Sequence, residues 1–517
     1  MSSSTQATTG ALATTLILAI SWIVYHISKF GSREPGLPPG PPTVPILGNL
    51  LDFPSKHVYL KFQEWAKIYG EIYSLKLGSN TAIVLNSPKM IREFLETNSA
   101  NTSDRPDWYV PEYTTDGYSL VFARYGSTWR NLRRAVHDIL TKEACTRHLP
   151  IQRAESTQLL YDILKEPENV YHQCRRYSTS VILSVVFGTR TPHFNSHVIK
   201  QFEGVQRKWD HINGPGATPP IDIFRFLRYI PERWAPWKAM CNEIKVVKES
   251  CISVLRTIYK LNDLEVNYAG GILLEAGSDT TAVFLQFFVA CLVEYPQVQK
   301  QAQKEIDAVV GLDRSPILDD WENLPYLQAV VREVHRFRPI VPSGVPHTNI
   351  QDQVIEGYYV PKGTYLFMNT WTVSHDENDF DQPGDFIPER FLKTEFGTKE
   401  GVDDSARRHD LPFGSGRRIC PGMQLANNSI MMNAMNLVWA FNFNQTCNPQ
   451  TGELIPIDLN NLTEGVLSIP KPFICDIQPR SQGHADIIRN DFMEARSIFA
   501  EFEQELSKED SDFVSQY

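Results

Sequence analysis

The chain has 517 residues, of which 42% are hydrophobic and 21% are charged, a composition that is ordinary for a globular protein. Its formal net charge of -10 argues against nucleic acid as the main partner, because binding to phosphate needs a basic face. The 8 cysteines show no paired short spacings, so no disulfide framework is expected. The length alone suggests several domains.

Residues 1–34 predict a membrane anchor. No Asp, Glu, Lys or Arg occurs before His26, and the run from Gly10 to Ile27 is apolar and long enough to cross a bilayer. A cleaved signal peptide is the alternative, but a basic region at its start and a small-residue cleavage site are missing. Because Lys29 and Arg33 follow the run, the positive-inside rule places the rest of the chain in the cytosol.

Residues 35–48 are rich in proline and predict a stiff, extended hinge between the anchor and the body, which comprises residues 49–517. The body is predicted to be mainly α with small β-sheets. The tail from Arg480 to Tyr517 predicts one amphipathic helix. Other helices are expected in the ranges 58–69, 88–98, 128–140, 151–188, 236–261, 263–293, 325–337 and 423–441, and strands in 72–77, 81–85, 358–360 and 365–369.

A glycine-rich turn, residues 413–422, carries Cys420 just before the predicted helix that begins at Met423. The helix N-terminus and the neighbouring Arg417 and Arg418 favour an anion, which predicts a thiolate at Cys420. Such a thiolate is a catalytic nucleophile, a metal ligand or a buried cysteine. Because no second cysteine lies close, a zinc site is not supported, and a metal with one protein ligand remains.

The longest predicted helix, Asp263 to Val293, has the polar centre Ala276-Gly277-Ser278-Asp279-Thr280-Thr281. A carboxylate is costly to bury in an otherwise apolar helix and calls for an explanation. One explanation is close packing by small residues, with threonine hydroxyls bonded to the preceding turn. The other is general acid chemistry by Asp279 and Thr280.

The spacing of Phe413, Gly416, Arg418, Cys420 and Gly422 resembles the haem-binding loop of the cytochrome P-450 family, and the resemblance covers nearly all of the chain after residue 35. It implies a haem domain over residues 49–517, haem b as cofactor and Cys420 as the axial ligand of its iron. The residues that the resemblance places around the haem are Cys420, Arg418, Phe413, Gly414, Gly422, Trp129, Arg133, His347, Arg105 and Ala276.

The implied function is that of a fungal monooxygenase, which inserts one atom of O2 into a lipophilic small molecule in secondary metabolism or xenobiotic oxidation. Electrons would come from NADPH through a separate reductase, and the enzyme would be anchored in the endoplasmic reticulum membrane with its catalytic domain in the cytosol. The reductase is expected to dock on a basic surface. The residues of that surface would be Arg130, Arg134, Lys142, Arg407, Arg408 and Arg417.

Trp129 and Arg133 lie one turn apart on a predicted helix, so both can bind one anion. A solvated basic helix is the alternative. The resemblance implies that they hold a haem propionate, with His347 as a further partner, although a lone histidine after proline is otherwise an ordinary surface residue. For Asp279 and Thr280 it implies the supply of protons during oxygen activation.

Glu333 and Arg336 lie on one face of a predicted helix and can form an ion pair. Downstream, residues 386–391 match the family segment whose arginine, here Arg390, joins that pair in a buried triad. The triad is predicted to be structural. Losing one member is expected to abolish haem incorporation, since breaking a buried charge network costs about 3 to 5 kcal/mol.

The family usually has another helix and loop between the helix that ends near Lys260 and the one that begins near Asp263, and this chain has almost nothing there. A real shortening and a gene-model error both stay open. The alternative functions are a haem-thiolate isomerase or dehydratase, or an inactive haem-binding protein; the Asp279 and Thr280 pair favours oxygen activation. Substrate contacts are expected from residues 107–122, 205–230, 272–280, 340–345 and 461–465.

Overall fold

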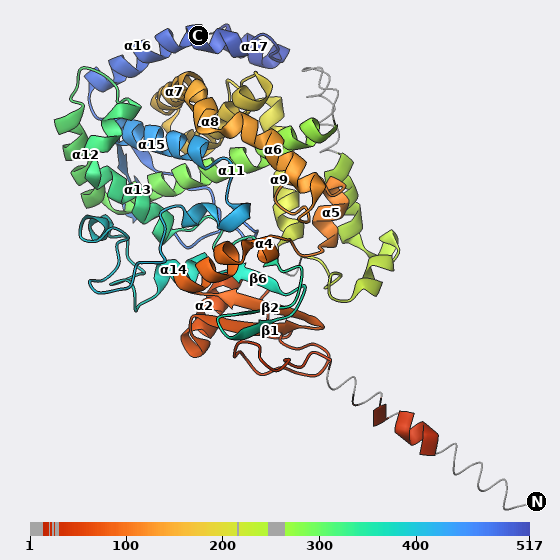
Figure 1. Ribbon diagram of the computed structural model, residues 1–517. Coiled ribbons are helices and arrows are strands. Elements are labelled where there is room, and N and C mark those ends of the chain that lie inside the picture. Colours follow the sequence, from red (N-terminus) through yellow and green to blue (C-terminus); the bar gives the residue numbers. More distant parts are fainter. Residues whose placement is uncertain are drawn as a thin grey trace, which may run out of the picture.

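The computed structural model describes residues 14–19, 21–22, 25, 30–214, 217–246 and 264–516. A large helical part lies on one side of a small sheet, and the C-terminal helices lie along the opposite side of the helical part (Figure 1). The helices are α2 (Val58–Tyr69), α3 (Pro88–Arg92), α4 (Ser99–Thr102), α5 (Tyr109–Thr115), α6 (Ser127–Leu140), α7 (Lys142–Lys165), α8 (Val170–Phe187), α9 (His197–Asn213), α11 (Leu264–Glu294), α12 (Pro296–Val309), α13 (Pro325–Phe337), α14 (Thr370–His375), α15 (Met423–Ala440), α16 (Gln482–Phe499) and α17 (Lys508–Val514).

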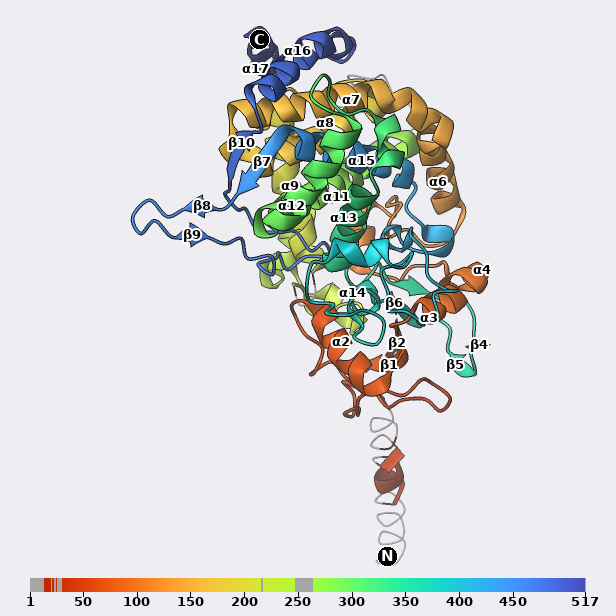
Figure 2. The same cartoon turned by 90° about the vertical axis from the view of Figure 1, so that its left-hand side faces the viewer.

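Four small sheets accompany the helices, so the predicted fold class, mainly α with small sheets, is confirmed. The largest has the order β1-β2-β6-β3, and within it only β2 and β6 run parallel. The others pair β4 with β5, β7 with β10 and β8 with β9; the β8–β9 hairpin projects from the body (Figure 2). The strands are β1 (Ile72–Leu77), β2 (Asn80–Leu85), β3 (His347–Thr348), β4 (Gln353–Ile355), β5 (Tyr358–Val360), β6 (Tyr365–Met368), β7 (Phe441–Asn444), β8 (Thr446–Cys447), β9 (Leu454–Ile455) and β10 (Asp476–Pro479).

Helix α11 runs through the core. Its second half is apolar on every side and is buried among α8, α13 and α15, with Phe284, Phe287 and Phe288 in the largest core cluster. Such all-round apolarity is typical of a helix at the centre of a large domain. In the part of the chain that the structure describes, Gly270–Glu294 is the one helix long and apolar enough to cross a membrane, and it is mostly buried inside the protein.

Two of the predicted helices are each two separate helices in the structure. The range 151–188 is two helices, because the chain leaves the helical conformation at Glu166, before Pro167, and re-enters it at Val170. The tail is also two helices and not one, since α16 ends at Phe499 and the side chain of Ser507 caps α17. Helix α16 packs on α7, where the Phe492 and Tyr161 rings stack with centroids 3.9 Å apart.

Several expectations fall partly outside the described residues. The predicted helix 236–261 is helical from 236 to 246, and the remainder lies outside the description. The expected shortening between residues 260 and 263 lies outside it altogether. Of the expected anchor, residues 14–19, 21–22, 25 and 30–34 are described. Those up to residue 25 are helical and exposed, whereas 30–34 are not helical.

Candidate active site

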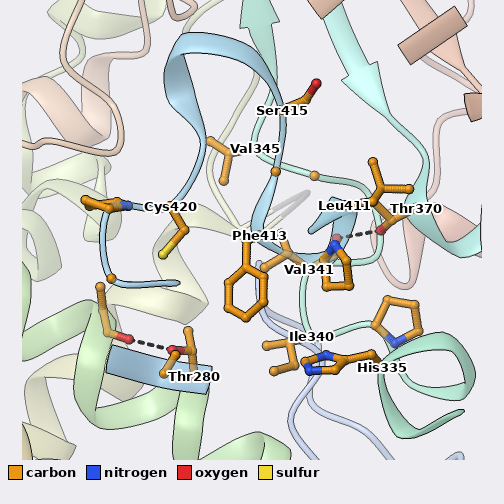
Figure 3. Close-up of a pocket in the computed structure, with 18 of the residues that line it drawn as sticks. Thr280, His335, Ile340, Val341, Val345, Thr370, Leu411, Phe413, Ser415 and Cys420 are labelled. Carbon is orange, nitrogen blue, oxygen red and sulfur yellow. Dashed lines mark hydrogen bonds between the residues drawn. The ribbon is translucent and has the colours of Figure 1, made fainter. Parts of the chain in front are cut away.

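A cavity of about 410 Å³ lies between the centre of α11 and the turn that precedes α15. Figure 3 shows Cys420 and Phe413 from the turn, and Thr280 from α11, around this space. Most of the surrounding side chains are apolar, and they come from α6, α8, α11, α13 and the segment 339–347. Every residue predicted to contact a cofactor lines the cavity: Cys420, Arg418, Phe413, Gly414, Gly422, Trp129, Arg133, His347, Arg105 and Ala276.

The turn before α15 has a backbone that only glycine accommodates at two points. Gly414 and Gly416 have φ angles of +94° and +61°. A Cβ atom at position 416 would lie 1.9 Å from the carbonyl oxygen of Leu95, so this position also needs the close approach. The N–H of Cys420 donates to the carbonyl oxygen of Phe413 at 2.8 Å. The turn is therefore closed on itself and holds the Cys420 side chain at the cavity.

Burial raises the pKa of the Cys420 thiol, while the N–H of Gly422 and the charge of Arg133 lower it. The two arginines next in sequence do not face the sulfur. Arg417 donates to the hydroxyl of Tyr125, and Arg418 donates to backbone carbonyls. These arginines therefore do not supply the charge next to the sulfur that the sequence suggested; a metal ion bound by the sulfur would deprotonate it.

Arg418 is buried against the aromatic face of Trp129, with its guanidinium carbon 4.2 Å from the ring centroid. Its Nε donates to the carbonyl of Ser103 and its Nη2 to that of Ala123, both at 2.8 Å. Burial lowers the pKa of Arg418 to about 9, with the charge of Arg133 acting in the same direction and that of Asp104 opposing it. The side chain is held in place by carbonyl oxygens, and its charge is not neutralised by them.

Arg105 and His347 line the other side of the cavity, and backbone carbonyls hold their side chains as they hold that of Arg418. Nη1 of Arg105 donates to the carbonyls of Val345 and Pro346 at 2.6 and 2.7 Å. Burial and the nearby Arg418 hold the pKa of Arg105 well below its usual range. In β3, Nδ1 of His347 lies 2.9 Å from the carbonyl of Thr102, which leaves Nε2 for a ligand.

Arg133 and Trp129 of α6 line the cavity, and neither the guanidinium nor the indole N–H has a hydrogen-bond partner among the described residues. Burial lowers the pKa of Arg133. Buried polar groups in folded proteins are normally paired, so an unpaired cation and indole N–H at a cavity indicate an anionic ligand. The solvated basic helix considered as the alternative is excluded for these two side chains, because both face inward.

The centre of α11 supports both explanations of its polar sequence. Gly277 packs against α8, where a Cβ atom would lie 2.8 Å from Cγ1 of Ile182, and the hydroxyl of Thr280 donates to the carbonyl of Ala276 at 2.8 Å. These are the small-residue packing and the back-bond. Thr280 also faces the cavity, so its hydroxyl oxygen is accessible to a ligand there.

Asp279 does not line the cavity. Its side chain is buried, and Oδ1 accepts from Nη2 of Arg175 in α8 at 2.6 Å, while Oδ2 has no partner in the described part of the chain. Burial raises the pKa of Asp279, and Arg175 lowers it. Arg175 pairs in turn with Glu203 of α9 at 2.5 Å. Asp279 directly precedes Thr280 in α11, but its carboxyl group faces α8 and not the cavity, with one oxygen available for a proton.

Comparison with known proteins decides the family. The family model for cytochrome P-450 matches residues 38–257 and 255–475. A cytochrome P-450 monooxygenase of Armillaria gallica is 44% identical over 504 residues, which is 93% of this chain and 97% of that protein. The chain belongs to the cytochrome P-450 family. It is therefore an oxidoreductase of the monooxygenase class, as the sequence predicts, and the family binds haem.

Further relatives are also fungal monooxygenases of this family. A cytochrome P-450 monooxygenase of Arthrobotrys oligospora is 35% identical, covering 93% of this chain and 96% of its own length. The cytochrome P-450 monooxygenase patI of Penicillium expansum is 34% identical, with coverage of 95% and 99%. The two stretches matched by the family model meet at residues 255–257, next to the expected shortening, and the match ends at residue 475, before α16 and α17.

The side chains that line the cavity of this cytochrome P-450 are suited to a haem. One end presents the Cys420 sulfur, and the rim presents unpaired or carbonyl-held cations with no carboxylate among the cavity-lining residues. Haem brings an iron for a thiolate and two carboxylates for such cations. The unpartnered Arg133 and Trp129 and the free Nε2 of His347 are the groups that these carboxylates would satisfy.

The predicted ion triad forms as expected. Glu333 of α13 is fully buried, and its oxygens accept from Nε and Nη2 of Arg336 at 2.7 and 2.8 Å and from Nε of Arg390 at 3.2 Å. The N–H of Ile387 adds a fourth bond to Glu333 at 2.8 Å. Arg336 also donates to three backbone carbonyls, so the triad joins α13 to the long loop that precedes the cysteine turn.

Two of the five predicted substrate-contact segments do not line the cavity, namely 205–230 and 461–465. They pack elsewhere: Trp209 contacts Phe122 with ring centroids 6.0 Å apart, and Gly465 packs beside Asp210. The segments 107–122, 272–280 and 340–345 do contribute to the lining. Their cavity residues are Leu120, Val121, Ile272, Leu273, Ala276, Gly277, Thr280, Ile340, Val341, Gly344 and Val345.

The expected basic surface is smaller than predicted. Arg407 is buried and paired with Asp379 and Asp404, and Arg408 is paired with Glu96 at 2.8 Å, so these two cations are already neutralised. Sequence reasoning also missed Arg175 and His335. His335 lines the cavity beside Phe413, and burial lowers its pKa to about 4, so it is neutral. The exposed members of the surface are Arg130, Arg134, Lys142 and Arg417.

Proposed function

We propose that this cytochrome P-450 binds haem b and inserts one atom of O2 into a lipophilic small molecule, with NADPH electrons delivered by a separate reductase. The observation that carries the proposal is that Cys420 and Thr280 face one mostly apolar cavity. When bound, the haem supplies the activation of oxygen, and the protein orients it. Similarity to fungal monooxygenases supports a role in secondary metabolism or xenobiotic oxidation.

The residues around the cavity have separate tasks in this proposal. Cys420 binds the iron. The hydrogen bond that the N–H of Cys420 donates to the carbonyl of Phe413 keeps the sulfur in one position. Arg133, Trp129 and His347 bind the two carboxylates of iron protoporphyrin IX. Arg105 and Arg418 add positive charge that their backbone bonds hold in place. Phe413, Gly414, Gly422 and Ala276 leave room for the flat ring.

Proton supply is assigned to Asp279 and Thr280. Oδ1 of Asp279 accepts from Arg175, so Oδ2 is the atom that takes and releases a proton. Burial holds the carboxyl pKa above its usual value, which suits a general acid near neutral pH. The hydroxyl of Thr280 donates to the carbonyl of Ala276 and faces the cavity. In this proposal it turns to donate its proton to the reacting oxygen and is reprotonated from the side of Asp279.

The cavity lining favours a lipophilic substrate. Ile272, Leu273, Ile340, Val341 and Val345 offer only hydrocarbon to a ligand, and burying apolar area contributes about 25 cal/mol per Å². Of the charged residues of the cavity, Arg105, Arg133 and Arg418 belong to the proposed carboxylate cradle. Arg336, Arg407 and Arg408 also line the cavity but are paired with carboxylates of the protein. A substrate would therefore be held by shape and apolar contact, with Thr280 as the polar group nearest to it.

An anchor in the endoplasmic reticulum membrane, with residues 49–517 in the cytosol, is part of the proposal. The described residues of the anchor up to Tyr25 are helical, and Leu16, Ile17, Leu18 and Trp22 are 62 to 64% exposed, as expected of a helix that faces lipid. The body adds an exposed apolar surface near the point where the anchor enters. It comprises Val44, Ile46, Phe226, Tyr229 and Trp234, and its two parts meet where Ile223 packs on Gly78 beside Ile46.

The reductase is proposed to dock on the exposed cations Arg130, Arg134, Lys142 and Arg417. Arg417 and Arg130 both lie over the ring of Tyr125, which contacts Trp129 with centroids 5.2 Å apart and the two rings tilted by 41°. The surface therefore lies directly outside the cavity wall. Complementary charge mainly raises the association rate, so its effect falls with ionic strength.

A carbon monoxide difference spectrum of the reduced protein tests the haem and its ligand, because an absorbance maximum typical of imidazole-ligated haem would exclude Cys420 as the ligand. The Thr280→Ala variant tests the reaction. We expect it to consume NADPH with reductase while releasing peroxide in place of product, since the hydroxyl between Asp279 and the reacting oxygen is gone. The measurement is the ratio of product to NADPH, and Ser278→Ala, which removes a buried hydroxyl outside the cavity, is the control.

An isomerase or dehydratase would give the opposite result. Neither reaction needs protons delivered to oxygen, so Thr280→Ala would leave its turnover unchanged and NADPH would not be consumed. The pair Asp279 and Thr280 favours the monooxygenase, because a buried carboxyl with one free oxygen directly precedes, in the sequence of α11, a hydroxyl that lines the cavity.

A further inference from the structure

The C-terminal end of the chain lies against the connector between α8 and α9, residues 188–196. The family model matches no residue after 475, and the part beyond it continues through α16, which packs on α7 (Figure 1). Residues 499–514, which we call the strap, then contact the connector, where the N–H of Arg190 donates to the carbonyl of Phe502 at 3.1 Å. This main-chain bond joins two segments that are far apart in the sequence.

Arg190 is the first side chain that the strap holds. This side chain is 1% exposed; its Nε donates to Glu155 of α7 at 2.8 Å, and its Nη1 donates to Glu503 of the strap at 2.7 Å. The ring of Phe499 covers the guanidinium, whose carbon lies 3.8 Å from the ring centroid. Because Glu155 is shared with Arg176, Arg190 depends on the strap for its second carboxylate.

The strap makes a second set of contacts at the start of α9. Ser196 occupies the N-cap position of this helix, but its hydroxyl does not cap the helix and donates to Oδ1 of Asp510 instead. Asp510 is buried, and its Oδ2 accepts from the hydroxyl of Ser507 at 2.8 Å. A carboxylate is favourable at this end of a helix. Beside it, the ring of Phe513 lies 4.4 Å from that of His193.

The other end of α9 contacts a segment that forms part of the cavity wall. Trp209 packs on Phe122 with ring centroids 6.0 Å apart, and Ile212 belongs to the same apolar cluster as Val110. Phe122 directly follows Val121, which lines the cavity. Helix α9 therefore connects the strap to the cavity wall, and a displacement of its start is passed along the helix to the segment 107–122.

We propose that the strap, residues 499–514, fixes the start of α9 and thereby slows the exchange of small molecules between the cavity and the solvent. The strap does not line the cavity, so it acts on the rate of exchange and not on the contacts that a bound molecule makes. This inference rests on the proposed function in one respect, namely that the cavity takes up haem and a lipophilic ligand.

Hydrogen exchange of the full-length, haem-loaded protein tests the hold of the strap on the connector. Two amides report on it. That of Arg190 donates directly to the strap, and that of Lys200 donates to the carbonyl of Ser196 in the first turn of α9. We expect both to be protected in the wild type, because neither can exchange until the local structure opens.

Two variants release the strap at separate points. Glu503→Ala removes the second carboxylate of Arg190, and Asp510→Ala removes the carboxylate at the start of α9. Each should raise the exchange rate of the Arg190 amide at least about tenfold, and that of Lys200 in the same direction, since opening costs less. The matched controls are Glu505→Ala and Asp512→Ala, which remove exposed carboxylates of the strap and should change neither rate.

Stopped-flow binding of 1-dodecylimidazole measures the consequence at the cavity. This lipophilic probe binds haem iron through its imidazole nitrogen and changes the haem absorbance. We expect its association and dissociation rates both to rise at least about fivefold in Glu503→Ala and Asp510→Ala, with a dissociation constant within about twofold of the wild type, because only the opening step is altered. The two control variants should match the wild type.

Each part of the inference can fail separately. Unprotected amides in the wild type, or protection that both strap variants leave unchanged, would overturn the hold of the strap on α9. Exchange that rises equally in α13 would show that the strap supports the whole fold, and would also overturn it. Faster amide exchange with unchanged probe rates would contradict the effect on the cavity. Failure to bind haem would instead refute the proposed function, and the Arg190 amide would still report on the strap.

Discussion

Two buried carboxylates of this protein, Glu333 of α13 and Asp279 of α11, are each paired with arginine, yet they accept different numbers of hydrogen bonds. Glu333 accepts four hydrogen bonds, from Arg336, Arg390 and the backbone of Ile387. Asp279 accepts one, from Arg175, and its second oxygen has no partner among the described residues.

The difference separates a group built for stability from one suited to chemistry. Glu333 accepts four hydrogen bonds and is paired with two arginines, which hold it in the charged form, and these neighbours keep the loop before Cys420 in place. A carboxylate with one free oxygen and a pKa raised by burial can exchange a proton at little cost to the fold. The same isosteric change, from carboxylate to amide, should therefore have unlike effects at the two positions.

The largest effect is expected for Glu333→Gln. The amide group would direct N–H donors at arginine donors and leave Arg336 and Arg390 buried without a counter-charge, so we expect a loss of about 3 to 5 kcal/mol of unfolding free energy. Because the triad supports the loop that carries Cys420, haem content should fall with it. Denaturant unfolding and the haem-to-protein ratio measure both. Normal stability with full haem content would show that the triad is dispensable.

A smaller effect, of a different kind, is expected for Asp279→Asn. The amide oxygen can still accept from Arg175, so stability should stay within about 1 kcal/mol of the wild type. Product formation should fall about hundredfold, the usual contribution of a general acid, while haem content and the carbon monoxide spectrum stay normal. A variant that lost haem in the way of Glu333→Gln would remove the distinction between the two carboxylates.

Sequence alone predicted the parts of the site that depend on local spacing. The cysteine turn, the pair of Trp129 and Arg133 one helical turn apart, and Thr280 on α11 all lie at the cavity, because each is set within one element or one turn. Helix α13 and helix α2 have the predicted ends, and local signals account for the proline at the start of α13 and for Gly70 at the end of α2.

What the sequence could not show depends on contacts between distant segments. Arg175 meets Asp279 across 104 residues, and no spacing rule connects α8 to α11. The segments 205–230 and 461–465 were expected at the substrate, but their side chains pack with each other and with Phe122, a choice made by competing apolar contacts. Likewise, the charge on Arg407 was visible in the sequence, whereas its burial against Asp379 was not.

The subtlest test of the comparison is Arg175→Gln, which removes the partner of Asp279 and leaves the carboxyl group itself. At Glu333 the loss of an arginine is severe, because the remaining hydrogen-bond donors keep the buried carboxylate charged. At Asp279 the free Oδ2 can take up a proton, so we expect a loss of only about 1 to 2 kcal/mol near neutral pH. Since burial raises the pKa of Asp279 and Arg175 lowers it, the variant retains only the raising influence.

The pH dependence of Arg175→Gln follows from that shift. The folded variant holds a proton that the unfolded chain releases above the ordinary carboxyl pKa of 3.8, so its unfolding free energy should fall as pH rises from about 4 through the raised folded value. The same shift keeps Asp279 protonated to higher pH, so the alkaline limb of turnover should move upward. Denaturant unfolding at pH 5 and pH 8, with a pH–rate profile, measures both, and Glu203→Gln is the control because it removes only the outer partner of Arg175. A variant as unstable as Glu333→Gln at both pH values would mean that Asp279 stays charged, and the free oxygen would then have no part in proton supply.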